Sequence, residues 1–504
     1  MTGLPRRHWL VAVLLAVGLV LRLLAQIAYR PALLYIDTPK YLYNSYPGSD
    51  PVGYKAPLKL LLPLGGLGTV TAFQHLLGLA IAVTGYVILI RRGSPRWLAA
   101  LAVAPVLLDA YQIQIEQTIM PDIWFEALIV AGIAILLSRS EIGITPRAII
   151  LAGLVLGVSA TFRQVGEILL LPALLYLFAA GGGSRTVLTR SAVFTVAFAI
   201  PIGAYMTGSY ILTGHFWLAS ATPSLSSYGR MATAADCATL RIPAYQRPLC
   251  PTARERAFGI DWLDHDAHSP LKAYVAPADV NRYAAIASFN RAVALQQPQR
   301  VLAAIAGDSL KLFALTRTSS QGGTPISRWQ FQTFYPVYPS WVTVGSGRTV
   351  VLGVHPLPGT GPLVMQRLAP ALGGKAEVSK PVAAFLRGYQ SHGGYTPGPL
   401  MAIFTLAGLC GALLALARRR SRRRSGGSGD PAMAALLFFG CGAAVLAMSD
   451  AFQFSWRYQL PGFVTLPQAG ALGAAAVLSY LAKRGHAGAA QPADQQAELA
   501  TPAV

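Results

Sequence analysis

Segments of mostly apolar residues alternate with polar stretches along most of the chain. A helix that crosses a bilayer needs about 20 consecutive, mostly apolar residues. Ten segments approach this pattern, the shorter ones suiting tilted or sheltered helices: residues 8–28, 70–90, 96–111, 123–138, 148–163, 167–181, 191–212, 397–417, 432–449 and 461–481. The pattern predicts an all-α polytopic membrane protein with about ten transmembrane helices.

Basic residues decide how these helices are oriented, because cytoplasmic loops carry an excess of Lys and Arg. The basic clusters all fall on one side of the alternation: Arg6 with Arg7, 91–96, 139–147, Arg185 with Arg190, the arginine run that begins at Arg418, and Lys483 with Arg484. We therefore expect a multi-pass plasma-membrane protein with both termini in the cytoplasm. The arginine run is interpreted as a topology signal, with binding to anionic lipid as the alternative.

The loops on the other side divide the chain into regions. An N-terminal transmembrane core spans 1–212 and contains the first external loop, 29–69. It is followed by a large extracytoplasmic loop domain of mixed structure at 213–396 and by C-terminal transmembrane helices at 397–484. The tail at 485–504 is polar and rich in small residues, and we expect it to be disordered. Within the large loop, the stretch from Val301 to Arg317 has the spacing of an amphipathic helix on a membrane surface. Residues 324–361 are typical of loops and short strands.

Composition supports a membrane protein and excludes several other classes. Charged residues make up 12% of the chain, about half the share usual in soluble domains. The formal charge of +21 would suggest nucleic-acid binding in a soluble protein. Here the charge lies largely in short basic loops, so no nucleic-acid partner is expected. The sequence contains no CxxC, HExxH or Walker motif, so metal-hydrolase and ATPase functions have no support.

Two of the four cysteines, Cys237 and Cys250, lie in the large external loop. Because that side is oxidising, we expect them to form a disulfide, which would stabilise the loop by about 3 kcal/mol. The alternative is two free thiols. Cys410 and Cys441 fall within apolar segments and are interpreted as packing residues.

The stretch from Tyr35 to Leu60, in the first external loop, carries more chemistry than a simple connector needs. Its carboxylate closest to the first apolar segment is Asp37, which we interpret as the central catalytic group. Other ionisable residues cluster at the same membrane interface: Arg22, Glu116, Asp122, Glu126, Arg163, Glu167 and Arg457. Such groups are costly at membrane depth and usually face a cavity or a partner. Arginine suits a phosphate, and a carboxylate can act as a general base.

Each of these residues also has a structural interpretation. Asp37 could cap a short interfacial helix, because Thr38 and Pro39 follow it. Glu116 and Asp122 could pair with nearby basic residues. Arg163 and Glu167 have the spacing of an ion pair within one helix. Arg22 could extend its charge to the interface, and Arg457 could anchor the end of a helix.

The order and sidedness of these motifs resemble the GT-C superfamily of membrane glycosyltransferases, which use polyprenyl-phosphate sugars. The features are Asp37 in an acidic first loop, GYKAPL from Gly53, a second acidic loop, an arginine that ends a later helix, and RYQLP from Arg457. The likeness is strongest to the protein O-mannosyltransferase and aminoarabinose-transferase branch. Two stretches of the large loop, from Gly229 and from Asn290, look like actinobacterial members.

The resemblance assigns roles to individual residues. It makes Asp37 the first-loop catalytic aspartate, and Lys55, Arg163 and Arg457 contacts of the donor phosphate. Glu116 and Asp122 match the second acidic loop, which in some branches helps to bind a divalent metal ion. The implied partners are a polyprenyl-phosphate-linked sugar, the lipid bilayer, and an acceptor glycan, lipid or protein.

The expected reaction is attack by an acceptor hydroxyl on the anomeric carbon, with inversion and with Asp37 as the base. Two other classes remain open. A ligase or polymerase of surface polysaccharide also uses lipid-linked sugars, but it relies more on arginine and histidine than on a first-loop aspartate. A transporter of lipid-linked sugar usually has repeat symmetry and broken helices at the membrane midplane, and the sequence has neither.

Overall fold

The computed structural model describes residues 7–43, 50–138, 144–219, 225, 227–318, 324–335, 340–344, 348–352, 376–418 and 430–498. Each of the ten apolar segments predicted from the sequence lies in a helix. This confirms the all-α polytopic fold. Part of the basic stretch 139–147 and the arginine run after Arg418 lie outside the described residues.

Six of the described helices are long and apolar enough to cross a membrane: α2 (Trp9–Ala28), α4 (Lys55–Arg91), α10 (Ser184–Thr213), α20 (Gly398–Ala417), α22 (Pro431–Phe452) and α23 (Leu460–Glu498). A seventh span is formed if α5 (Arg96–Leu108) and α6 (Ala110–Glu116), which meet at 51°, are taken together. The other predicted spans correspond to α7 (Asp122–Leu137), α8 (Pro146–Phe162) and α9 (Leu170–Ala179). A helix of the length of α8 is only about 25 Å long, somewhat less than a bilayer core of about 30 Å.

The centre of the bundle is formed by α22 and α23, and α10 lies at its periphery. Two thirds of the apolar window of α22 and of α23 is buried, against 17% for α10. Small residues let α20 and α23 approach closely, because a side chain at Gly473 would stand 2.0 Å from the carbonyl oxygen of Ala407. Exposed apolar side chains on α10, such as Val196 and Ile200, suit contact with lipid.

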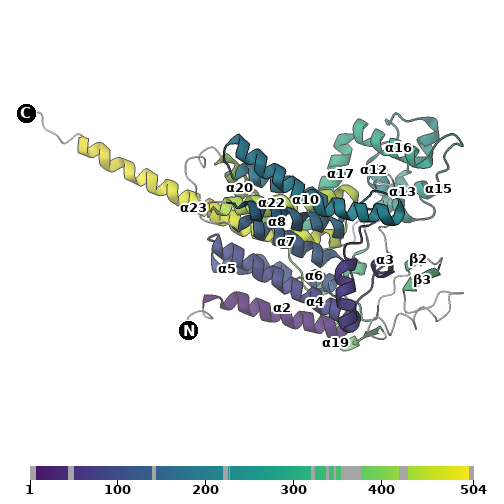
Figure 1. Ribbon diagram of the computed structural model, residues 1–504, viewed down its shortest axis with the longest axis horizontal. Helices are drawn as coiled ribbons and strands as arrows, with labels where there is room; N and C mark the ends of the chain where they lie inside the picture. Colours follow the sequence, from purple (N-terminus) through teal and green to yellow (C-terminus); the bar gives the residue numbers. More distant parts are fainter. Residues whose placement is uncertain are drawn as a thin grey trace, which may run out of the picture.

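The long loop regions, with their short helices and strands, lie at one end of the bundle, called the loop end here. The start of α2 and the end of α23 lie at the other end (Figure 1). At the loop end, α3 (Thr38–Tyr43) lies beside the start of α4. The second half of the first external loop, predicted at 29–69, is helical from Lys55, and α4 bends at Gly65 and Gly66. The reason is local: Leu58 to Leu62 favour a helix, and the two glycines after Pro63 interrupt it.

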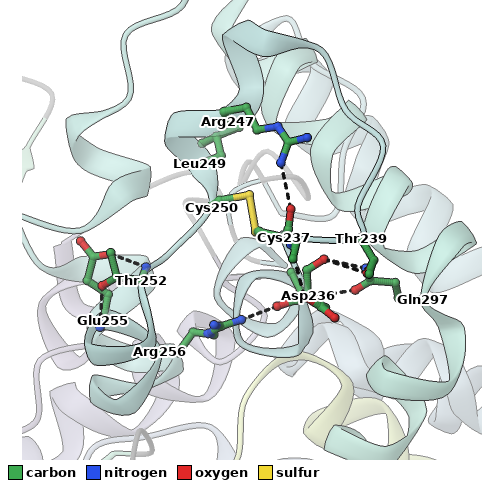
Figure 2. The surroundings of a disulfide bond; sticks show 12 residues. Asp236, Cys237, Thr239, Arg247, Leu249, Cys250, Thr252, Glu255, Arg256 and Gln297 are labelled. Carbon is green, nitrogen blue, oxygen red and sulfur yellow. Dashed lines mark hydrogen bonds between the residues drawn. A yellow bond between two sulfur atoms is a disulfide. The ribbon is translucent and has the colours of Figure 1, made fainter.

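The large loop region predicted at 213–396, called external here after its predicted side of the membrane, contains a small helical domain with its own apolar core. Its elements are α12 (Tyr228–Ala234), η2 (Ala244–Leu249), α13 (Ala253–Phe258), α14 (Ile260–His265), α15 (Pro270–Ala273), α16 (Arg282–Gln296) and α17 (Pro298–Leu310). Tyr228, Leu263 and Phe289 are fully buried in this core. The sulfurs of Cys237 and Cys250 are bonded, with their Cα atoms 6.0 Å apart (Figure 2).

The predicted amphipathic stretch forms α17 and the short turn η3 (Lys311–Phe313). An amphipathic helix on a membrane surface would expose its polar side chains to water, and α17 does not do so at Asp308. Asp308 is buried and accepts a hydrogen bond from Arg230, while Leu302 and Leu310 are exposed. Arg230 also donates to the backbone carbonyl of Asp450 at 2.6 Å, so α17 and α12 are fastened to α22 through their polar side chains.

Short strands and further turns complete the loop end. β2 (Ser340–Val344) and β3 (Arg348–Leu352) pair antiparallel, as expected for residues 324–361, and β1 (Tyr29–Arg30) pairs antiparallel with β4 (Glu377–Val378). The remaining elements are η1 (Gln164–Leu169), η4 (Ile326–Trp329), α19 (Lys380–Ser391) and η5 (Trp456–Gln459). The apolar face of α19 packs against α2, where Ala383 and Leu386 join Leu21 and Ala25 in one cluster.

The C-terminal tail departs from its prediction. Disorder was expected for 485–504, but α23 continues as a helix to Glu498. Alanine and glutamine are the most frequent residues between 485 and 498, and both favour a helix. A helix already begun in the bundle also extends more easily than a new one forms.

Candidate active site

The first and second external loops are held together by backbone hydrogen bonds. Leu33 donates to the carbonyl of Gln117 at 2.9 Å, and Ile119 donates to the carbonyl of Leu33 at 3.0 Å. The hydroxyl of Thr38 accepts from the backbone of Tyr35 at 2.8 Å and donates to the carbonyl of Ile119 at 3.2 Å. These contacts fix Asp37, at the start of α3, relative to Asp122, at the start of α7.

Arg457 joins these two carboxylates. Its Nη1 donates to Oδ2 of Asp37 at 3.1 Å, and its Nε donates to Oδ1 of Asp122 at 2.9 Å. Arg163 makes a second ion pair with Oδ1 of Asp122. Four of the predicted site residues, from four separate parts of the chain, therefore form one network. Asp122 is 2% exposed and Asp37 is 26% exposed, so Asp37 is the more accessible carboxylate of the two.

Lys40 adds a cation that the sequence analysis did not assign to the site. Its Nζ lies 2.9 Å from Oδ1 of Asp37 and also pairs with Asp50. Its spacing of three residues from Asp37, across the start of α3, is the signal that could have identified it. Asp37 precedes α3 directly, as a helix cap would, but its carboxylate contacts Lys40 and Arg457.

Aromatic rings surround the two arginines of the network. The guanidinium carbon of Arg163 lies 4.8 Å from the ring centre of Tyr458, and that of Arg457 lies 5.7 Å from the ring centre of Trp329. Trp329 belongs to η4, so the large external region contributes directly to this site. Its ring also packs on Tyr35, with centroids 4.7 Å apart. Arg163 therefore contacts Asp122 and Tyr458 in place of the ion pair with Glu167 that the sequence spacing allows.

The charges of the network determine the ionisation of Asp37. Burial raises the pKa of this carboxyl, but the neighbouring Lys40 and Arg457 outweigh burial and hold the pKa well below its ordinary value. Burial lowers the pKa of Lys40, and Asp37 and Asp50 outweigh that effect, so its pKa lies above the ordinary value. Asp37 is therefore ionised and Lys40 is charged at neutral pH.

Lys55 lies at the edge of the site, as the first residue of α4. The segment just before it is docked onto other helices: the amide of Gly53 donates to the carbonyl of Thr161, at the end of α8, at 2.9 Å. The amide of Val52 donates to the hydroxyl of Tyr205, on α10, at 2.9 Å. Lys55 itself is partly buried. Its position at the loop end suits a residue that reaches toward a ligand from the side of α4.

Glu116 belongs to a different network, although it was grouped with Asp122 in the sequence. Arg22 donates to both of its oxygens, at 2.8 and 2.7 Å, and Nδ1 of His75 lies 3.0 Å from Oε2. Glu116 is fully buried and Arg22 is 1% exposed. The carboxylate points into the helix bundle, so Arg22 forms a buried ion pair and does not extend to the interface.

This arrangement does not fit a metal ion at Glu116 and Asp122. The oxygens of Glu116 are occupied by Arg22 and His75, and those of Asp122 by Arg163 and Arg457. Among the described residues there is no group of three or more His, Cys, Asp and Glu side chains that could hold one.

No family model and no curated protein matches the chain. Among solved structures, it is similar to the protein O-mannosyltransferase Pmt1-Pmt2 complex of S. cerevisiae bound to the sugar donor, with 16% identity over 46% of this chain and 37% of that chain and a TM-score of 0.34. It is similar to the oligosaccharyltransferase of Archaeoglobus fulgidus, with 12% identity over 93% of this chain and 49% of that chain and a TM-score of 0.41. ArnT from Cupriavidus metallidurans bound to undecaprenyl phosphate has 14% identity over 92% of this chain and 77% of that chain, with a TM-score of 0.32. The chain thus spans less than half the length of the first two proteins.

Proposed function

We propose that this protein is an integral membrane glycosyltransferase that moves a sugar from a polyprenyl-phosphate donor to an extracytoplasmic acceptor hydroxyl. The observation that carries the proposal is the network around Arg457, in which an accessible, ionised Asp37 lies among cations at the loop end of the bundle. A lipid-linked sugar phosphate keeps its lipid in the bilayer and presents its reactive carbon at this level. The carboxylate then faces the acceptor and the cations face the phosphate.

In the proposed step, the acceptor oxygen attacks the anomeric carbon and its proton passes to Asp37. The bond between that carbon and the phosphate oxygen breaks, and the phosphate leaves with the electron pair. Positive side chains stabilise the charge that develops on it. Lys55, Arg163 and Arg457 are the residues proposed for this role. Attack from the side opposite the leaving group inverts the anomeric carbon.

The low pKa of Asp37 makes it a weak base while Arg457 is bound to it. A phosphate competes for the guanidinium, because arginine matches phosphate and carboxylate oxygens with the same fork of donors. Donor binding would therefore draw Arg457 from Asp37 and raise the basicity of the carboxylate. This sequence of events favours deprotonation of the acceptor only when a donor is present. Asp122, which contacts two arginines and is buried, is the residue proposed to hold them in place.

The experiment is sugar transfer in membranes supplied with a set of radiolabelled polyprenyl-phosphate sugars. Wild type is compared with Asp37→Asn, which keeps the size of the side chain and removes its charge. A general base contributes about a hundredfold to ten-thousandfold, so transfer should fall by at least a hundredfold at equal expression. Asp279→Asn, an exposed position in the large external region, serves as the matched control.

Equal transfer by wild type and Asp37→Asn would remove Asp37 from the mechanism. Movement of labelled lipid between leaflets, without transfer from any donor, would instead establish a transporter. The anomeric configuration of the product, read by NMR, tests inversion separately.

A further inference from the structure

Arg317, a residue of the large external region, is buried at the base of that region. Its side chain is 4% exposed and donates two hydrogen bonds to Asp109, which is fully buried, at 3.0 and 2.6 Å. Four aromatic rings lie around its guanidinium carbon with centres 4.5 to 5.2 Å away: Tyr111, Tyr395, Trp456 and Phe463. Such an enclosure fixes a planar guanidinium more closely than an ion pair alone would.

Asp109 stands at the break between α5 and α6. Its carboxylate accepts the amide of Tyr111 at 3.0 Å, capping α6, and the amide of Thr396 at 2.8 Å, just before α20. Arg317 therefore meets a carboxylate that already joins two transmembrane elements. The ion pair adds the external region as a third partner.

Trp456 connects Arg317 and its neighbour Thr318 to the proposed active site. Its indole N–H donates to the carbonyl of Thr318, the residue after Arg317, at 3.0 Å, and its ring stacks on the guanidinium of Arg317. Trp456 directly precedes Arg457, and both lie in η5, a turn of four residues. Because the two residues are consecutive in so short a turn, a displacement of Trp456 would move the backbone that carries Arg457.

We propose that Arg317 is a positioning residue that holds Trp456 in place and thereby keeps the guanidinium of Arg457 against Asp37 and Asp122. The inference rests on the proposed function, because it assigns Arg317 a role through Arg457 in that reaction. Arg317 itself lies behind η5 and touches no reacting group. The competing interpretation is that Arg317 and Asp109 only stabilise the fold.

Arg317→Lys separates the two interpretations, because lysine keeps the charge but cannot donate two parallel hydrogen bonds or stack as a plane. We expect kcat to fall by about tenfold or more, with a smaller change in KM for the donor, since Arg457 is proposed to act on the leaving phosphate. The acid limb of kcat/KM should also move to higher pH, because Arg457 would no longer help to keep Asp37 ionised. A merely structural role would lower the amount of folded protein and leave this limb unchanged.

Two further variants make the test sharp. Trp456→Phe keeps an aromatic ring but removes the hydrogen bond to Thr318 and part of the indole surface, so it should lower kcat by about twofold to tenfold and move the acid limb in the same direction. Arg291→Lys, at an exposed position on α16, is the control for the same chemical change. Folded Arg317→Lys and Trp456→Phe proteins with the kcat and acid limb of wild type would overturn the proposal.

A second readout does not depend on transfer. In a protein with Cys410→Ser and Cys441→Ser, the thiol introduced by Asp37→Cys lies beside Arg457 and Lys40, which favour its thiolate. The pH dependence of its alkylation should move to higher pH when Arg317→Lys is added, and an unchanged profile would count against the positioning role. If wild type transfers no sugar but the alkylation profile shifts, the proposed function fails while the positioning role stands.

Discussion

The guanidinium of Arg457 donates to the carboxylate of Asp37 at 3.1 Å, although 420 positions separate the two residues in sequence. The contact joins the first external loop to the last one. A second hydrogen bond from the same guanidinium reaches Asp122. The loops that carry Asp37, Asp122 and Arg457 therefore meet at one side chain. The charge state of Asp37 therefore depends on a residue distant from it in the sequence as well as on its neighbour Lys40.

The first prediction concerns the pH dependence of transfer when Lys40 is replaced. The groups that interact electrostatically with Asp37 are Lys40, Arg457, Tyr35, Tyr41 and Tyr458, and Asp50 pairs with Lys40. Because the pKa of Asp37 is depressed, its ionised form persists in the folded protein as the pH falls below the ordinary range of a carboxyl, and it is lost only as the pH falls through the folded value. Lys40→Met removes one of the two cations that oppose burial, so the pKa of Asp37 rises.

The ratio of kcat/KM at pH 5 to that at pH 7 should therefore be lower in Lys40→Met than in wild type. The measurement is a pH–rate profile with saturating acceptor and limiting donor. Lys59→Met removes a lysine from the exposed surface of α4 and should leave the acid limb in place. If the limb of Lys40→Met coincides with that of wild type, Lys40 does not set the ionisation of Asp37.

The second prediction concerns Gly53, which brings the first loop against α8. A Cβ atom at this position would stand 2.5 Å from the carbonyl oxygen of Thr161 and 2.8 Å from its carbonyl carbon. Because these are backbone atoms, Gly53→Ala must push the loop away, and overpacking of this kind costs about 1–3 kcal/mol. Lys55, two residues later, should shift with the loop.

We therefore expect Gly53→Ala to raise KM for the donor and to lower the melting temperature in detergent. Gly203→Ala is the control, because among the described residues no atom outside the local helix backbone lies within 4 Å of the added Cβ. It should melt at or slightly above the wild-type temperature, since alanine favours a helix over glycine. A Gly53→Ala protein with unchanged KM would show that the docking of this loop does not matter for donor binding.

Sequence patterns predicted the helices and selected four residues that the fold brings together in the candidate site, and the reasons are visible in single residues. Apolar length identified the helices, and the sidedness of the polar loops selected Asp37, Asp122, Arg163 and Arg457, which the fold brings together. Glu116 was grouped with Asp122 because only five residues separate them. Which way each carboxylate points depends on the packing of α2 and α4, and sequence spacing alone does not contain that information.

Lys40 and Arg317 were missed for different reasons. Lys40 has a local signal, its spacing from Asp37, but lysine is common in external loops and rarely informative there. Arg317 ends a stretch whose spacing predicts an amphipathic helix on the membrane surface. Its partner Asp109 is 208 positions away, and neither residue belongs to a motif. Only the assembled bundle places them together.

The third prediction concerns the buried pair of Arg22 and Glu116. Removing one partner leaves the other charge buried and unpaired, which costs about 3–5 kcal/mol. Arg22→Met and Glu116→Gln should each lower the free energy of unfolding by about this amount. The double variant should lose much less than the sum, because neither charge then remains.

A double-mutant cycle of unfolding in mixed micelles measures this coupling. His75 also contacts Glu116, so it is kept unchanged in all four proteins. Additive losses would mean that Arg22 and Glu116 stabilise the bundle independently of one another. Transfer activity per folded molecule should remain in Glu116→Gln, because Glu116 lies outside the network of Asp37.

The fourth prediction concerns Asp264, a buried carboxyl of the external domain. Burial raises its pKa to about 7, against the hydrogen bond that it accepts from the amide of Gly229 at 2.7 Å. Asp261 raises the pKa further, whereas Lys272 and Arg230 lower it. A Cβ at 229 would stand 2.8 Å from the carboxylate, so a larger residue there would displace the side chain of Asp264.

Since the folded pKa lies above the ordinary value of 3.8, the folded domain holds a proton that the unfolded chain has already released. The associated stability is fully present below the unfolded pKa and is lost as the pH rises toward about 7. The pKa difference corresponds to about 4 kcal/mol. Stability against proteolysis between Gly229 and Asp308 should therefore decline from pH 4 to pH 7 in wild type.

Asp264→Asn has no proton to release, so its protease resistance should vary less over this pH range, and it should be more resistant than wild type at pH 7.5. Asp279→Asn, at an exposed position, should follow wild type. Limited proteolysis of the full-length protein in detergent, with fragments identified by mass, provides the measurement. Parallel pH curves for wild type and Asp264→Asn would mean that Asp264 ionises at its ordinary pKa and that the carboxylate is solvated in spite of its position beneath Gly229.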